Sequence, residues 1–174
     1  MPIVKNSLPS GTAVRDRWLL CVAFALAVAL LTFVGARADQ RAGDDATFRK
    51  LTDDYCAAWS SGNPDNAAKF YAHDDGLIFY DVTPFSYHGW AEYVPGVKKA
   101  LLDSAAEAKL TAGKDLKVTR HGSVAWTTVP MHFYEKTKDA KVIEADLRYT
   151  GIWEKRGKTW VLVHEHLSVP FSGN

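Results

Sequence analysis

Apolar positions at helical spacing mark the region that follows residue 44. A helix is predicted to begin at Asp44 and to end at Gly62, because apolar residues recur every three or four positions between them. These residues are Phe48, Leu51, Tyr55, Ala58 and Trp59. Asn63, followed by a proline, is typical of the start of a second helix, since asparagine caps a helix and proline is tolerated at its first position.

A short strand and a third helix are predicted next. Residues 77–81 form a compact apolar run that indicates a strand, and a turn sequence follows it. Gly89 opens a longer stretch at helical spacing that extends to Ala105. Pro95 lies inside this stretch, so the helix is expected to be kinked or to begin late.

From Asp115 onward, the period of the apolar positions changes from about 3.6 to 2, which is typical of strands. Turn signals divide this region into predicted antiparallel strands at residues 116–120, 123–135, 142–154 and 159–169. Helices followed by antiparallel strands predict a single α+β domain in which the helices pack on one face of the sheet.

The last strand has two different faces if its side chains alternate strictly. One face then carries Trp160, Leu162, His164, His166 and Ser168, and the other carries Val161, Val163, Glu165, Leu167 and Val169. A polar and aromatic face fits the lining of a cavity, and an aliphatic face fits packing on helices or on a second subunit. The pattern leaves open which face is which.

The N-terminal region is predicted to be a signal peptide of residues 1–38. Basic side chains precede the uncharged run 18–36, which ends in the sequence Ala36-Arg37-Ala38 that a signal peptidase accepts. Cleavage after Ala38 leaves residues 39–174 as a periplasmic or secreted domain. The alternative is an uncleaved membrane anchor, because the run of about 19 residues approaches the length that spans a bilayer.

Charge and cysteine content narrow the classes of function. Removing residues 1–38 takes away four basic and one acidic side chain, which turns 21 basic against 20 acidic into 17 against 19. A slightly acidic domain without a basic stripe gives no reason to expect nucleic acid as a partner. Cys56 is the only cysteine after residue 38, so it cannot form a disulfide within the mature chain, and a buried filler is the expected role.

Several short motifs, in order along the chain, resemble the SnoaL-like branch of the nuclear transport factor 2 superfamily. They are Tyr55-x-x-x-Trp59-x-x-Gly62, Tyr71-Ala72-x-Asp74, Phe79-x-Asp81, Gly89-x-x-x-Tyr93, Gly122-x-x-Ala125-Trp126, Arg148-x-Thr150-Gly151-x-Trp153-x-Lys155 and Gly157-Lys158-x-Trp160-x-x-x-His164-x-His166-x-Ser168-x-Pro170. The closing strand is also similar to that of the association domain of calcium/calmodulin-dependent kinase II, in the same superfamily.

This resemblance implies a cone, in which a strongly curved antiparallel sheet wraps the N-terminal helices around a central apolar pocket. It also implies dimerisation through the sheet, so a homodimer is expected. The superfamily includes isomerases, cyclases, dehydratases and subunits that only associate, so it does not imply one activity.

Asp81 is the first candidate catalytic residue, because it follows an apolar strand where a buried carboxyl group could act as a general base. The alternative role is structural, as a cap on the Thr83-Pro84 turn or as a partner of a basic side chain. A steroid isomerase that combines an aspartate base with tyrosine and aspartic acid donors offers an analogy. Tyr93 is therefore a second candidate, and Tyr55 and Tyr134 are candidate ligand-binding residues.

His164 and His166 lie two positions apart, so both rings are expected on the same side of the strand. His166 is a candidate catalytic residue and His164 a candidate ligand-binding residue, with a structural hydrogen-bond network as the alternative. Paired histidines also chelate metals, and His132 or Asp81 could supply a third ligand. No metal site is predicted.

Arg148 is the last candidate catalytic residue, because a guanidinium group binds a carboxylate ligand well. A structural ion pair with a buried carboxylate is the alternative. Trp59 and Trp126 are candidate ligand-binding residues, although most tryptophans in a domain of this size belong to the core.

Together, these observations predict an exported domain that binds a small apolar or aromatic molecule. The domain is expected to isomerise, cyclise or dehydrate this molecule by acid–base chemistry without a cofactor. The alternative is a non-catalytic module that binds a ligand or forms a dimer. The sequence contains no phosphate-binding glycine loop, dinucleotide fingerprint or serine-hydrolase elbow.

Overall fold

The computed structural model describes residues 37–171. Residues 1–36, which include most of the predicted signal peptide, lie outside this range. The chain divides into two units, residues 1–43 and 44–174. In the first unit, residues 37–43 are helical. Along the described residues, no helix combines the length and the apolar character needed to cross a lipid bilayer.

The second unit contains the folded domain, which begins with a helix at residues 44–60. Two short helices, α2 (Pro64–Ala67) and η1 (Ala68–Phe70), follow, and the Asn63 side chain caps the first of them as predicted. The third helical stretch consists of α3 (Gly89–Val97) and a π-helical turn, η2 (Lys98–Leu102). Pro95 lies inside α3.

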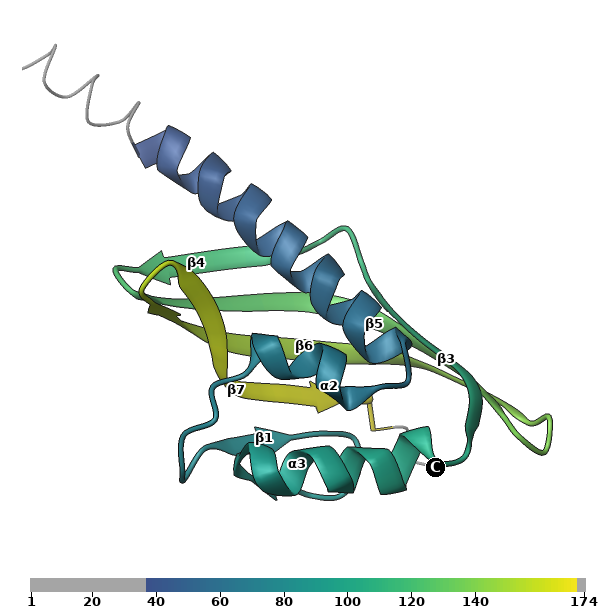
Figure 1. The fold of residues 1–174 in the computed structure, drawn as a ribbon. Coiled ribbons are helices and arrows are strands. Elements are labelled where there is room, and N and C mark those ends of the chain that lie inside the picture. Colours follow the sequence, from purple (N-terminus) through teal and green to yellow (C-terminus); the bar gives the residue numbers. More distant parts are fainter. Residues whose placement is uncertain (1–36, 172–174) are drawn as a thin grey trace, which may run out of the picture. The chain divides into compact units, whose positions relative to one another are not determined.

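The sheet consists of seven strands (Figure 1). They are β1 (Ile78–Tyr80), β2 (Tyr87–His88), β3 (Ala105–Ala112), β4 (Lys117–His121), β5 (Val124–Thr137), β6 (Val142–Arg156) and β7 (Thr159–Ser168). Their spatial order is β2-β1-β7-β6-β5-β3, and β4 also pairs with β5. The sheet is mostly antiparallel, as predicted, but β1 runs parallel to β7. The strong curvature that the resemblance implies stays a prediction.

Strand β3 is the main error in the predicted secondary structure. Its sequence, AAEAKLTA, is rich in residues that favour helices, and its first residue was assigned to the end of the third helix. Seven of its residues nevertheless pair with β5, from Ala105 opposite Thr137 to Ala112 opposite Met131. Pairing with a long neighbouring strand therefore outweighs local helix propensity here.

The first helix packs against β6 and β7 through aromatic contacts. The Phe48 ring lies 5.9 Å from that of Trp153 and 4.9 Å from that of Trp160, and the Tyr55 ring lies 5.5 Å from that of Tyr149. All five side chains are buried. This core, as expected for a domain without a disulfide, is built largely from aromatic surface.

A β-bulge interrupts the last strand. Ile152 of β6 pairs with His164, but the next residue, Trp153, pairs with Leu162, so Val163 has no partner across the ladder. Before the bulge, Leu162 faces the core, and after it, Glu165 and Leu167 do. The predicted strict alternation was therefore wrong, because the extra residue reverses the side to which all later side chains point.

Candidate functional site

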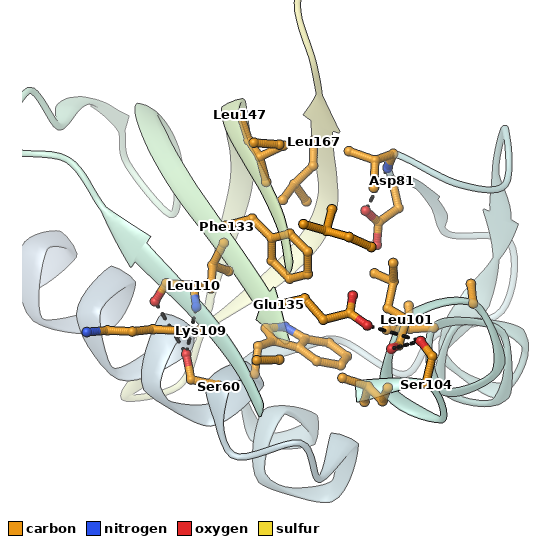
Figure 2. A pocket seen from close by; sticks show the side chains of 18 of the residues that line it. Ser60, Asp81, Leu101, Ser104, Lys109, Leu110, Phe133, Glu135, Leu147 and Leu167 are labelled. Carbon is orange, nitrogen blue, oxygen red and sulfur yellow. Dashed lines mark hydrogen bonds between the residues drawn. The ribbon is translucent and has the colours of Figure 1, made fainter. Parts of the chain in front are cut away.

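A cavity of about 330 Å³ lies between the helices and the sheet (Figure 2). The first helix contributes Tyr55 and Trp59 to its wall, and α3 contributes Tyr93. Most of the remaining lining is aliphatic or aromatic, and it comes from α3, η2 and strands β3, β5, β6 and β7. These residues include Val97, Leu101, Leu110, Phe133, Ala145, Leu147 and Leu167. A mostly apolar cavity with few polar groups is typical of a small-molecule site.

Asp81 directly follows β1, and its carboxyl group lines the cavity. Its Oδ1 accepts a hydrogen bond from the backbone N–H of Val82 at 2.7 Å, and its Oδ2 lies 3.2 Å from the hydroxyl oxygen of Tyr93. Removal from water raises the pKa of Asp81 above its usual range, against the effect of these two contacts. Asp81 therefore both caps the turn and presents a perturbed carboxyl group to the cavity.

Behind this wall lies a second carboxyl group, Glu165, which is 0% exposed. Three tyrosines surround it. The hydroxyl groups of Tyr71 and Tyr93 donate to Oε1 at 2.8 and 2.5 Å, and that of Tyr55 donates to Oε2 at 2.9 Å. Among residues 37–171, no Lys, Arg or His side chain forms an ion pair with Glu165.

The electrostatic state of this cluster follows from its burial. Burial raises the pKa of Glu165 to about 7; the hydrogen bond from Tyr93 opposes this shift, and the charge of Asp81 adds to it. Burial first, and the charge of Glu165 second, raise the pKa of Tyr55, Tyr71 and Tyr93 well above the usual range. These tyrosines therefore keep their protons and remain hydrogen-bond donors.

Tyr93 connects the two carboxyl groups. Its hydroxyl carries one hydrogen but lies within hydrogen-bonding distance of both Asp81 and Glu165. Two full hydrogen bonds require that one of the carboxyl groups is protonated. When Asp81 holds the proton, it donates to Tyr93, which donates to Glu165; when Glu165 holds it, both directions reverse. The three groups thus form a path for one proton between the cavity wall and the interior.

Four of the predicted site residues come together at this cavity, namely Tyr55, Trp59, Asp81 and Tyr93. Trp59 also donates from Nε1 to the hydroxyl oxygen of Tyr71 at 3.0 Å, which orders the tyrosine cluster. These four residues therefore lie around one cavity, and their catalytic and ligand-binding roles stay predictions.

The two histidines lie outside the cavity wall. His166 is exposed, and its ring lies 5.7 Å from that of Tyr80. The His164 ring lies 5.4 Å from the same tyrosine, and its Nδ1 lies 2.7 Å from the carbonyl oxygen of Ile78. Both histidines face the same side, as predicted, but the bulge directs them away from the core.

The other three predicted site residues also lie outside the cavity wall. Arg148 is exposed on β6 and donates to the carbonyl oxygen of Val169 at 2.8 Å, so the expected carboxylate partner is replaced by a backbone carbonyl group. Trp126 is 40% exposed and stacks on His121. Tyr134 lies on the face of β5 that points away from the core, because the buried residues of β5 occupy the odd-numbered positions.

The metal alternative finds no third ligand near the two histidines. Within the described range of 37–171, no three His, Cys, Asp or Glu side chains lie close enough together to hold a metal ion. His132 instead contacts Asp146, with 2.9 Å between Nδ1 and Oδ1. Cys56 is buried, as predicted, and its burial raises the pKa of the thiol to about 12.

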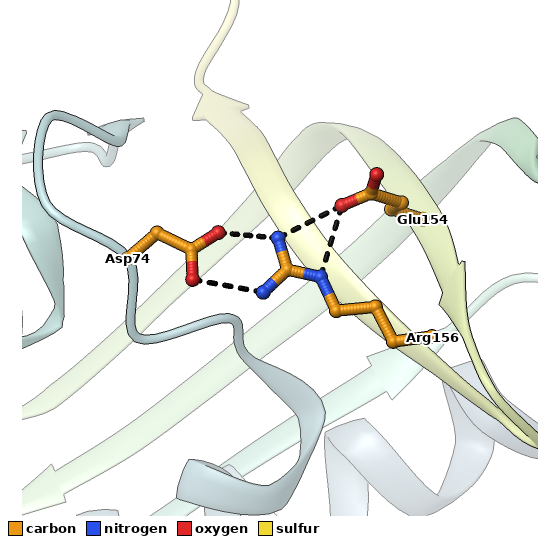
Figure 3. A network of polar contacts seen from close by, with 3 residues as sticks. All are labelled: Asp74, Glu154 and Arg156. Carbon is orange, nitrogen blue, oxygen red and sulfur yellow. Dashed lines mark hydrogen bonds and ion pairs between the residues drawn. The ribbon is translucent and has the colours of Figure 1, made fainter.

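A separate polar cluster lies at the end of β6 (Figure 3). The guanidinium group of Arg156 contacts both carboxylate oxygens of Asp74 and also Glu154, and its hydrogen bonds lower the pKa of Asp74. All three side chains are solvent-accessible. This network joins the loop before β1 to the sheet, and it contains no group that reaches the cavity.

Sequence reasoning missed two buried carboxyl groups, Glu165 and Glu135. Glu135 lines the cavity and is 2% exposed. A signal for Glu135 existed, because it shares the odd-numbered face of β5 with Val129 and Met131. Glu165 offered none, since the bulge at Val163 leaves no mark in the pattern of apolar residues.

Residues 49–172 match the SnoaL-like domain family. A search of curated protein sequences finds no match to this chain.

Solved structures give the same fold at low sequence identity. A nuclear transport factor 2-like superfamily protein from Salmonella enterica has a TM-score of 0.66 and 14% identity, covering 76% of this chain and 95% of that chain. A candidate scytalone dehydratase from Novosphingobium aromaticivorans has a TM-score of 0.68 and 10% identity, covering 77% and 89%. A candidate calcium/calmodulin-dependent protein kinase II association domain from Xanthomonas campestris has a TM-score of 0.62 and 21% identity, covering 71% and 86%.

At these identities the structural likeness establishes the fold alone. The SnoaL-like domain family matches most of the folded domain, and this match shows that the chain is a member of that family. The chain therefore belongs to the SnoaL-like domain family, and it has the nuclear transport factor 2-like α+β fold, with N-terminal helices and a mixed, mostly antiparallel sheet.

Proposed function

We propose that this domain binds a small apolar or aromatic molecule in the cavity and transfers a proton to and from it, with Asp81 as the general base. The observation that carries this proposal is the path from Asp81 through Tyr93 to Glu165, which begins at the wall of a mostly apolar cavity. Perturbed titratable groups in a cavity are typical of functional sites.

Each group has a distinct role in the proposed reaction. Asp81 removes a proton from a carbon atom next to a carbonyl group of the substrate, and its raised pKa brings it closer to neutrality, where a general base works best. Tyr93 orients Asp81 and exchanges protons with it, and Glu165 stores or supplies a proton behind the wall. Return of the proton from Asp81 to a different carbon atom isomerises the substrate. Transfer of the same proton to a hydroxyl group of the substrate, which then leaves as water, dehydrates it.

The proposal keeps Tyr55 and Trp59 as ligand-binding residues, because both line the cavity. It assigns no role to His166 or Arg148, whose side chains lie outside the cavity wall. The chemistry requires no cofactor, since every proton transfer occurs between the substrate and a carboxyl group of the domain.

Hydrogen exchange into 2-tetralone, an aromatic ketone with acidic protons beside its carbonyl group, tests this proposal. Nuclear magnetic resonance in D₂O follows the replacement of these protons by deuterium. We expect the protein to accelerate exchange above the buffer rate and the Asp81→Asn variant to lose about 10²- to 10⁴-fold of that acceleration, the usual contribution of a general base.

Asp75→Asn is the matched control, because it removes a carboxylate of the same type from an exposed turn. It should exchange at the wild-type rate. Equal rates for Asp81→Asn and wild-type protein would show that Asp81 is not the base.

The second candidate function is ligand binding without catalysis. It is favoured by the hydrogen bond from Val82 to Asp81, which gives this carboxyl group a structural role, and by the apolar lining. The same experiment separates the two functions. Binding of 2-tetralone with exchange at the buffer rate supports the non-catalytic module.

A further inference from the structure

Glu135 is a buried carboxyl group that the proposed proton transfer does not use. It lies near the end of β5, at an inward-facing position, and it lines the cavity while only 2% exposed. In Figure 2 its carboxyl group lies beside Ser104 and Leu101, whereas Asp81 lies nearer Leu167. The cavity therefore presents two acidic groups from different elements.

The protein itself provides little to balance Glu135. Oε1 accepts a hydrogen bond from the hydroxyl group of Ser104 at 3.0 Å, and across the described residues Oε2 has no hydrogen-bond partner. No Lys, Arg or His side chain of residues 37–171 forms an ion pair with Glu135. A buried carboxylate with one neutral donor is costly unless a cation or further donors reach it.

Among the described residues of the cavity wall, Lys109 is the one basic residue, and it forms no ion pair with Glu135. It occupies an exposed position of β3, opposite Tyr134 of β5. Figure 2 shows its side chain directed away from Glu135. The cavity thus has carboxyl groups facing inward and its only ammonium group facing out.

Aromatic rings complete the surroundings of this acidic group. Trp59, Tyr93 and Phe133 line the same cavity. The faces of aromatic rings attract cations, and the attraction is larger where water is excluded. An apolar cavity with an unpaired carboxylate and several aromatic rings suits a cation that carries an apolar body.

We propose that the ligand of this cavity is a small apolar or aromatic molecule with a basic nitrogen, and that Glu135 binds this nitrogen through Oε2. This inference rests on the proposed binding of a small molecule in the cavity, and it adds the chemical class of that molecule. The nitrogen satisfies Glu135, and the apolar part fills the space between Phe133 and Leu167.

Two probes of nearly equal shape test the inference. 1-Naphthylmethylamine is a cation at neutral pH, and 1-naphthylmethanol is its uncharged counterpart. Isothermal titration calorimetry with the wild-type protein is expected to give a Kd at least about tenfold lower for the amine, because a charge-assisted hydrogen bond is roughly twice as strong as a neutral one.

Three variants assign the preference to one carboxyl group. Glu135→Gln keeps the size and the contact with Ser104, and it should reduce the ratio of the two Kd values to about one while leaving the Kd of the alcohol unchanged within about twofold. Asp81→Asn should keep the preference. Glu144→Gln, which removes an exposed carboxylate of β6, should keep it as well.

Each other outcome contradicts a specific statement. Equal Kd values in the wild-type protein, a preference that survives in Glu135→Gln, or a preference that disappears in Asp81→Asn overturns the role of Glu135 and leaves the proposed proton transfer standing. No binding of either probe to the wild-type protein overturns the proposed binding function, and this inference with it.

A crystal structure of the wild-type protein with bound 1-naphthylmethylamine gives a second result that needs no variant. The nitrogen is expected within hydrogen-bonding distance of the Glu135 carboxylate. A nitrogen placed elsewhere in the cavity would refute the inference even if Glu135→Gln failed to fold.

Discussion

The carboxyl group of Glu165 is expected to make the stability of the domain depend on pH. Its folded-state pKa is about 7, above the usual value of 4.5, so the folded state binds its proton more tightly than the unfolded state does. This contribution to stability is complete below pH 4.5 and is lost as the pH rises through 7. Relative to Glu165→Gln, the wild-type free energy of unfolding should therefore fall by about 3 kcal/mol between pH 4.5 and pH 8.

Urea denaturation of both proteins across this pH range measures the difference directly. The difference between the two free energies of unfolding cancels the contributions of all titratable groups whose pKa is the same in both proteins. Asp81 is one of these groups if Glu165→Gln does not change its pKa. A difference that does not change with pH would contradict the buried, perturbed state of Glu165.

Tyr93 and Tyr149 form a matched pair that shows how much the hydrogen bonds of a buried hydroxyl group contribute to the free energy of unfolding. The Tyr93 hydroxyl contacts two carboxyl groups, whereas the buried hydroxyl group of Tyr149 has no hydrogen-bond partner among residues 37–171. Tyr93→Phe should lower the free energy of unfolding by about 1–3 kcal/mol, because it leaves Glu165 with one donor fewer.

Tyr149→Phe should leave the free energy of unfolding unchanged within about 0.5 kcal/mol or raise it slightly, because it removes a polar group that has no partner. Chemical denaturation of the two variants at one pH compares them. Equal losses of stability would show that the hydrogen bonds of Tyr93 do not set its contribution.

Among the elements of the fold, the bulge at Val163 of β7 places Glu165, and not His164, in the core. Without it, Glu165 would share a face with Val163, and His164 would share one with Leu162. Positions 163 and 164 are both half-buried and lie between two fully buried positions, Leu162 and Glu165.

Cysteine labelling measures this pattern in a Cys56→Ser background. Cysteines introduced at Val163 and His164 should both react readily with a water-soluble maleimide, whereas one at Leu162 or Leu167 should react slowly until the protein unfolds. Strict alternation predicts that positions 163 and 164 differ, so unequal reactivity at these two would contradict the bulge.

The same elements show how far the sequence predicts this fold. Apolar spacing predicts the first helix and strands β4 to β7 well, because each buries one face with the period of its own backbone. It misses β3, whose local helix propensity is outweighed by pairing with β5, and it misses the parallel contact of β1 with β7, which local pattern does not encode.

The candidate site likewise contains residues that the sequence predicts and residues that it places wrongly. Tyr55, Trp59, Asp81 and Tyr93 were predicted, because they lie on helices or directly after a strand, where position in the sequence determines direction. The histidines of β7 were grouped on one face with Trp160 and Leu162, which is wrong, since one inserted residue reverses every side chain that follows it.

At the scale of the whole molecule, the core lies entirely within the second unit. Every buried apolar residue of the described core has a number of 48 or higher, and residues 37–43 are helical and exposed. We therefore expect a chain that begins at Asp39 to fold and to keep the ligand-binding behaviour of the domain, because the buried apolar core of the described residues begins at Phe48.

Mass spectrometry of the protein purified from its own host tests the predicted export. Cleavage after Ala38 predicts a mature chain that begins at Asp39 and is recovered from the periplasm or the medium. An intact N-terminus in the membrane fraction would instead support the uncleaved anchor.

Under native conditions, mass spectrometry of the same sample shows whether the mature chain forms the predicted homodimer and whether it retains a ligand. A retained molecule with a basic nitrogen would account for both carboxyl groups of the cavity. Glu135 would bind the nitrogen, and Asp81 would face the carbon atom that loses its proton.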